Sequence, residues 1–84
     1  MVTTLKFNDL EIQIQAKGAE LISFKKNEKE YIWQANPDFW GKHAPVLFPI
    51  VGTLKNNTYQ YKNQNYELPR HGFARDLCFD LVHF

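Results

Sequence analysis

The sequence contains a single cysteine and no marked excess of charge of either sign. With only Cys78 present, an internal disulfide framework is excluded. Because Cys78 lies in the apolar run 77–79, we expect it to be a small buried hydrophobe rather than a reactive thiol. Ten Lys and Arg residues against nine Asp and Glu residues leave a net charge of +1, without the dense basic face that duplex binding requires. We therefore expect no nucleic-acid partner.

Long apolar runs are also missing from the chain. No stretch approaches the roughly 20 apolar residues that a membrane-spanning helix needs. Residues 1–6 turn polar at once and lack the apolar region of a secretory signal. The sequence therefore predicts a cytoplasmic protein without membrane association.

Aromatic residues, in contrast, are plentiful, with seven Phe, four Tyr and two Trp in 84 residues. Together with an apolar content of 44%, they indicate a packed core rather than disorder. A chain of this length forms at most one small domain, and its strands leave few residues to cover both faces of a sheet. We therefore expect part of the core to be supplied by chain outside these residues.

Alternation of apolar and polar residues with period two runs through much of the chain. It is clearest at residues 10–15, where Leu10, Ile12 and Ile14 share one face. The segments predicted as strands are 5–7, 10–15, 21–25, 30–34, 58–62, 66–68 and 77–84, with turns at 8–9, 26–29 and 63–65. About seven or eight short strands with closely spaced turn signals indicate an all-β sandwich or barrel.

Residues 35–54 interrupt this alternation. Pro37, Pro45 and Pro49 remove the N–H groups that a strand ladder needs, so no central strand is expected here. Bulky apolar residues fill the gaps between the prolines. Long apolar loops are usually packed against the rest of a domain and are often functional.

The loop 69–75 is the best candidate for chemistry. It places His71 next to Arg70 and four residues before Arg75, between two predicted strands. A loop histidine can act as an acid, a base or a hydrogen-bond donor, and guanidinium groups can bind hydroxyls or a phosphate. An ordinary solvated surface turn explains the same residues, and composition alone favours that interpretation.

Other candidates are weaker. His43, His83 and Cys78 show no spacing typical of a metal site, so we expect no metal. His43 is expected to cap its local backbone. No glycine-rich phosphate loop or nucleophile elbow is present. Three aromatic residues could form a stacking platform for a sugar ring, although such residues are more often core or loop-anchoring aromatics: Trp33, Phe39 and Trp40.

Several blocks of residues occur in an order typical of one family. They are Gly18-Ala19-Glu20-Leu21-Ile22-Ser23, Tyr31-Ile32-Trp33-Gln34, Pro37, Trp40, Ala44-Pro45-Val46-Leu47-Phe48-Pro49-Ile50-Val51-Gly52 and Leu68-Pro69-Arg70-His71-Gly72-Phe73-Ala74-Arg75. Over essentially the whole chain, this resembles the N-terminal part of aldose 1-epimerase-like proteins (galactose mutarotase superfamily), most closely their LacX-type branch. The combination outweighs the surface-turn interpretation of His71.

The resemblance implies that residues 1–84 are the N-terminal part of a single large antiparallel β-sandwich that holds a sugar in an open cleft. It implies interconversion of hexose anomers by general acid–base catalysis, without a cofactor. The expected partner is a hexose or a hexose phosphate. In the family the His of the His-Gly block lines the sugar site, so His71 is predicted to be catalytic and to bind substrate. Arg75 is predicted to bind hydroxyls or phosphate.

Two departures from the family pattern bear on activity. Thr53 follows the Val-Gly pair, where the family usually has an Arg that enters the pocket. The family's second catalytic His and its catalytic Glu lie beyond the matched region. We therefore expect a part of a longer domain that lacks a complete active site by itself. The alternative is a non-catalytic carbohydrate-binding or structural remnant.

Overall fold

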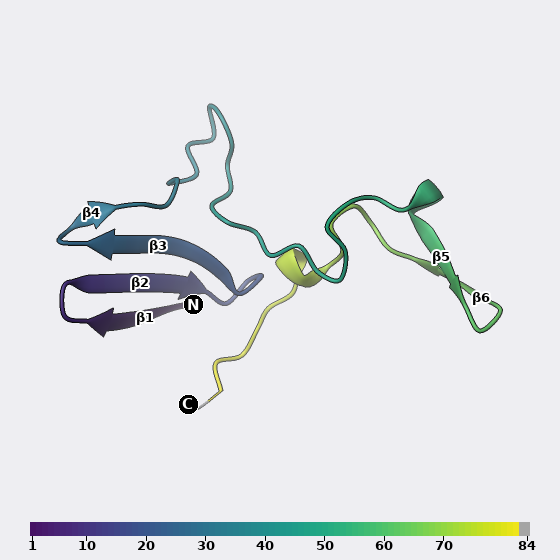
Figure 1. Ribbon diagram of the computed structural model, residues 1–84, viewed down its shortest axis with the longest axis horizontal. Coiled ribbons are helices and arrows are strands. Elements are labelled where there is room, and N and C mark those ends of the chain that lie inside the picture. The colour runs from purple at the N-terminus through teal and green to yellow at the C-terminus, as the bar shows by residue number, and fades with distance from the viewer. Residues whose placement is uncertain (83–84) are drawn as a thin grey trace.

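The computed structural model describes residues 1–82, whose strands form two separate antiparallel sheets joined by loops (Figure 1). The first sheet is a meander in the order β1-β2-β3-β4, and the second is the hairpin β5-β6. The elements are β1 (Val2–Phe7), β2 (Leu10–Gln15), β3 (Glu20–Lys26), β4 (Lys29–Glu30), β5 (Thr58–Tyr61), β6 (Gln64–Glu67) and the short 3-10 turns η1 (Lys55–Asn57) and η2 (Ala74–Asp76). No α-helix occurs in the described residues, which confirms the all-β prediction. In the same residues, no helix is long and apolar enough to cross a membrane.

The turns of the meander lie where the sequence predicted them. Asn8, with φ of 53°, joins β1 to β2, and Asn27 and Glu28, with φ of 51° and 69°, join β3 to β4. Asparagine tolerates this left-handed backbone better than most residues. In the second hairpin the positive φ values fall on Lys62 and Asn63, so the turn begins one residue earlier than predicted.

The predicted strand 30–34 forms only at its first residue, because β4 ends at Glu30. The Glu30 carboxylate accepts hydrogen bonds from the backbone N–H groups of Phe24 (2.8 Å), Tyr31 (3.0 Å) and Ile32 (3.2 Å). The Ser23 hydroxyl also donates to it. Tyr31 N–H also donates to the Phe24 carbonyl of β3 (2.8 Å), whereas the Phe24 and Ile32 N–H groups are taken up by the carboxylate. The expectation for residues 31–34 was therefore wrong.

The predicted strand 77–84 is also wrong over the part that can be compared. Residues 77–82 form no strand, and Cys78 makes only an isolated antiparallel bridge with Lys17. Alternation is present in the sequence, but the backbone of these residues pairs only with the turn between β2 and β3. Cys78 is exposed rather than buried. His83 and the last residue lie outside the described residues.

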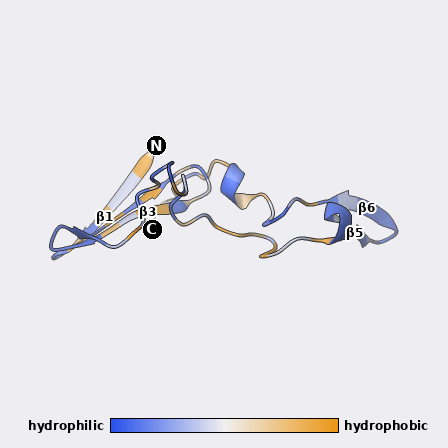
Figure 2. Ribbon diagram, turned by 90° about the horizontal axis from the view of Figure 1, so that it is seen from above, coloured by the Kyte–Doolittle hydropathy of each residue, from blue (hydrophilic) through white to orange (hydrophobic). Residues whose placement is uncertain are grey.

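The described part of the chain is one layer thick in most places. Its principal extents are 53 × 36 × 17 Å, and Figure 2 shows the thin profile from above. Leu68 and Ala74 are buried, whereas Phe7 is 70% exposed and Phe39 78% exposed. A single layer cannot cover its own apolar faces. The packed core expected from the aromatic content is therefore not completed within residues 1–82.

Two glycines mark where the chain passes closest to itself. A Cβ atom on Gly18 would lie 2.8 Å from the Arg75 carbonyl oxygen, and one on Gly72 would lie 2.2 Å from the Phe48 carbonyl oxygen. Both glycines have φ of +73°. Backbone hydrogen bonds accompany the first contact, from Gly18 N–H to the Leu77 carbonyl (2.6 Å) and from Phe79 N–H to the Ala16 carbonyl (2.8 Å). The segment 72–79 is thus held between the meander and the loop 35–54.

The hydrogen bonds to the Glu30 carboxylate predict a stability that depends on pH. Burial raises the pKa of Glu30, but hydrogen bonds from the Ser23 hydroxyl and three backbone N–H groups outweigh this effect and hold the pKa below its ordinary value. A carboxylate with a lowered pKa stabilises the fold above the pKa of the unfolded chain, and this contribution is lost as pH falls through the folded-state pKa. Glu30→Gln should lower the free energy of unfolding at pH 7 by about 1 kcal/mol, because hydrogen bonds to a charged acceptor are stronger.

Urea denaturation of wild type and Glu30→Gln at several pH values measures this effect. The difference should be largest near pH 7 and should shrink below about pH 4. Glu28→Gln, in the exposed turn, removes the same charge and should change little at any pH. A Glu30→Gln difference that is independent of pH would contradict the assignment.

The close approach at Gly72 gives a second prediction. Gly72→Ala should lower the free energy of unfolding by about 2–3 kcal/mol, because the new Cβ meets a carbonyl oxygen in a left-handed backbone. Gly52→Ala is the matched control, since its Cβ would meet no atom within 4 Å. Thermal or urea unfolding checks the pair. Equal midpoints for the two variants would show that the Phe48 contact is not maintained in solution.

Candidate functional site

The structure brings the loop 69–75 against residues 48–52, about twenty positions earlier in the chain. The Phe48 carbonyl accepts hydrogen bonds from the N–H groups of Phe73 (3.0 Å) and Ala74 (3.2 Å). His71 N–H donates to the Gly52 carbonyl at 2.9 Å. The two blocks that carry the family resemblance therefore form one backbone-linked unit, near the centre of Figure 1 where η2 lies.

His71 is fixed at both its backbone and its ring. Its φ is +67°, its side chain is half-buried, and ring atom Nδ1 contacts the Val51 carbonyl oxygen. A histidine in this conformation needs surrounding contacts to hold it, and the backbone bond to Gly52 is one of them. Among the described residues, ring atom Nε2 has no recorded hydrogen bond. The geometry thus leaves one nitrogen of the predicted catalytic residue available to a ligand.

Arg75 lies in η2 and is half-buried. One terminal nitrogen donates to the Arg70 carbonyl at 3.4 Å, and its Nε is buried with no hydrogen-bond partner among the described residues. A guanidinium fixed in this way keeps further N–H groups for hydroxyl or phosphate oxygens. The predicted substrate-binding role of Arg75 stays a prediction. Arg70 is exposed, and only its carbonyl takes part in this contact.

Glu20 is a residue that sequence reasoning missed. It is 6% exposed at the start of β3, and its carboxylate accepts a hydrogen bond from His43 N–H at 3.1 Å and lies 3.4 Å from His43 Nδ1. His43 therefore connects its loop to the sheet rather than capping its own backbone. The sequence did contain a signal, because Glu20 falls in the first of the blocks typical of the family, but its partner is 23 positions away.

Trp33 contacts both of the other aromatic residues considered as a stacking platform, Phe39 and Trp40. Trp33 Nε1 donates to the Trp40 carbonyl at 2.7 Å, and the Trp33 and Phe39 rings meet edge to face at 6.1 Å. These contacts support the loop-anchoring interpretation. All three side chains are exposed, so sugar stacking stays a prediction.

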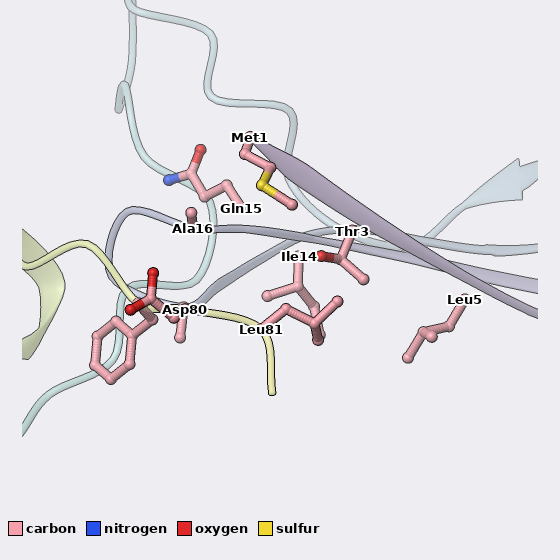
Figure 3. Close-up of a pocket in the computed structure, with 10 residues that line it drawn as sticks. Met1, Thr3, Leu5, Ile14, Gln15, Ala16, Asp80 and Leu81 are labelled. Carbon is pink, nitrogen blue, oxygen red and sulfur yellow. The ribbon is translucent and has the colours of Figure 1, made fainter. Parts of the chain in front are cut away.

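A hollow of about 330 Å³ lies away from His71 and Arg75. Figure 3 shows its lining, which includes Leu5 of β1, Ile14 of β2 and Leu81. It is mainly apolar, and its polar lining residues are Thr3, Gln15 and Asp80. Within residues 1–82, no group of three or more His, Cys, Asp or Glu side chains is placed to hold a metal ion.

Comparison with known proteins places these features in a family. The sequence model described as aldose 1-epimerase matches residues 1–84. The chromosomally encoded protein LacX of Lactococcus lactis subsp. lactis is 40% identical over 87 aligned positions, which cover 96% of this chain and 29% of that protein.

Two solved structures have the same fold over this region. The galactose mutarotase related enzyme from Lactobacillus acidophilus is 48% identical, with a TM-score of 0.91 over 100% of this chain and 29% of its own. A galactose mutarotase-like protein from Lactobacillus casei is 34% identical, with a TM-score of 0.90 over 98% of this chain and 29% of its own.

The predicted galactose mutarotase-like fold is thereby confirmed, with this chain forming part of it. The chain spans less than one third of the length of each relative, 29% in each case. The match to the family model is complete along the chain, and it includes the unit formed by residues 48–52 and 69–75. The chain belongs to the aldose 1-epimerase family.

Proposed function

We propose that this protein binds a hexose or a hexose phosphate and serves the interconversion of its anomers by general acid–base catalysis. The observation that carries the proposal is the anchored His71, with its backbone bonded to Gly52, its Nδ1 on the Val51 carbonyl and Nε2 left available. Family membership and the similarity to a galactose mutarotase related enzyme support it. The cytoplasmic location that the sequence predicts is consistent with such a role.

The chemistry needs two proton transfers and no cofactor. A base takes the proton from the anomeric hydroxyl while an acid gives a proton to the ring oxygen, and the bond between the anomeric carbon and the ring oxygen breaks. The aldehyde carbon turns, and reversal of both transfers closes the ring as the other anomer. In this proposal His71 handles the proton at the ring oxygen, and Arg75 binds a hydroxyl or a phosphate. No residue of this chain is assigned as the base.

A second candidate function is carbohydrate binding without catalysis. Thr53 stands where the family usually has an Arg, and a threonine supplies no cation to the pocket. The chain also spans 29% of its relatives' length. Sugar binding without a change in mutarotation rate is the behaviour that distinguishes this alternative.

Mutarotation of freshly dissolved hexose anomers, followed by polarimetry, tests the catalytic proposal. The protein should accelerate the approach to equilibrium above the buffer rate. His71→Ala should reduce the catalysed rate by about 100-fold or more, because a positioned acid or base contributes that much. His43→Ala is the comparison variant: it also removes an imidazole ring and loses the ring contact with Glu20, but the backbone N–H of residue 43 still reaches Glu20.

The outcomes separate the two candidate functions. Full activity in His71→Ala would remove His71 from the mechanism. Saturable amide shifts around Gly72 and Arg75 on adding hexose, with no rate effect, would select the binding-only alternative. If neither a rate effect nor amide shifts are observed, both candidate functions are excluded.

Arg75 gives a separate prediction on binding. Arg75→Ala should raise the dissociation constant for the sugar about tenfold, as expected for a lost hydrogen bond to a charged donor. Arg70→Ala removes the same charge from an exposed position but keeps the carbonyl contact, so it should bind almost as the wild type does. NMR titration or calorimetry measures both. Equal losses in the two variants would indicate a general charge effect rather than a contact by Arg75.

A further inference from the structure

The contact between His71 and Val51 determines more than the position of the ring. A backbone carbonyl oxygen can only accept a hydrogen bond, so Nδ1 of His71 must carry a proton to bond to it. In a neutral imidazole only one nitrogen carries the proton, and Nε2 is then left with its lone pair. The tautomer of His71 thus follows from the atom that faces it.

The backbone on both sides of the His71 side chain is anchored to the segment that the ring faces. His71 N–H is bonded to the Gly52 carbonyl at 2.9 Å, one residue from the carbonyl that faces the ring. The next residue, Gly72, is buried directly against the Phe48 carbonyl. Both sides of His71 are therefore fixed to the same segment, residues 48–52. Within that segment the Val51 carbonyl faces Nδ1 of the ring, which leaves Nε2 as the ring nitrogen that does not contact Val51.

We infer that the Val51 carbonyl holds His71 in the Nδ1–H tautomer and makes Nε2 the sugar-facing atom, a hydrogen-bond acceptor in the neutral ring. Val51 is then a positioning residue that acts through its backbone, while the residue as a whole is 72% exposed. That the partner is a sugar rests on the proposed function; the tautomer itself does not.

The Nδ1–H tautomer determines which sugar groups His71 can bind in its neutral form. A lone pair on Nε2 accepts a proton from a sugar hydroxyl, whereas the ring oxygen of a sugar carries no proton to offer. Neutral His71 therefore binds a hydroxyl group, and it can donate to the ring oxygen only after Nε2 has taken up a proton. A hexose that lacks the contacting hydroxyl should bind about five- to tenfold more weakly, because one hydrogen bond is lost.

The direct test is NMR of the protein labelled with ¹⁵N-histidine, without sugar, at a pH where the rings are neutral. Long-range proton–nitrogen correlations identify which ring nitrogen is protonated, and the spectrum of His71→Gln assigns the signals. The expected result is a proton on Nδ1 and none on Nε2 of His71. A proton on Nε2, or a mixture of tautomers, overturns the inference.

A pair of variants tests the same contact independently of spectroscopy. Asparagine and aspartate have almost the same shape, and both tolerate a positive φ, but only asparagine can donate to the Val51 carbonyl. His71→Asn should keep the urea midpoint of the wild type, and His71→Asp should lower it. Equal midpoints for the two variants would also overturn the inference.

Titration with hexose separates this inference from the proposed function. An Nδ1–H tautomer with no response to sugar would leave the tautomer established and reject the sugar site. A mixed tautomer in a protein that binds sugar would reject the role of Val51 and leave the function intact.

Discussion

The arrangement of the candidate site depends on one backbone contact, the approach of the Phe48 carbonyl to the chain at Gly72. The carbonyl accepts N–H groups from Phe73 and Ala74 at 3.0 and 3.2 Å, and the space between the two segments admits no side chain at residue 72. With this contact in place, residues 69–75 run alongside residues 48–52. His71 then reaches the carbonyls of Val51 and Gly52 with its ring and its backbone. Loss of the first contact would release the others together.

Other contacts hold the loop 69–75 and the residues that follow it to the meander β1–β4. Gly18 lets the turn after β2 lie against the Arg75 carbonyl, and the Gly18 N–H bonds the Leu77 carbonyl at 2.6 Å. The buried Glu20 holds His43, and thereby the loop that contains residues 48–52, to the start of β3. Most of these contacts use backbone atoms. A site held by backbone keeps its geometry without large side chains, which leaves the His71 and Arg75 side chains for a ligand.

The sequence was informative wherever local chemistry decides the structure. Period-two alternation located β2 and β3, and asparagine located two of the turns. The order of family blocks identified the fold and the loop of His71, which alternation could not do. The sequence failed where hydrogen bonds made by one particular side chain or backbone group decide the path of the chain. Residues 31–34 have strand-forming residue types, yet the neighbouring Glu30 carboxylate accepts the N–H groups of Tyr31 and Ile32.

The same limit explains why the predicted terminal strand does not form, why Cys78 is exposed and why the contacts around His71 were not predicted. Residues 77–82 alternate but find only the turn near Lys17 to pair with, so Cys78 stays exposed. Contacts made by backbone carbonyls, such as those of Phe48 and Val51, leave no trace in residue types. The roles of His71 and Arg75 in catalysis and binding likewise rest on resemblance, since residue types alone favoured a surface turn.

The thinness of the described layer, 17 Å along its shortest axis, has an electrostatic consequence for His71. A half-buried ring at the surface of such a slab is surrounded largely by water, whose high dielectric constant weakens every charge interaction made there. A second layer of protein over this face would replace water by a medium of low dielectric constant, and the same hydrogen bonds would then have several times the electrostatic strength. The geometry around His71 and the strength of the field acting on it are thus separable properties, the first set by residues 48–52 and the second by whatever covers them.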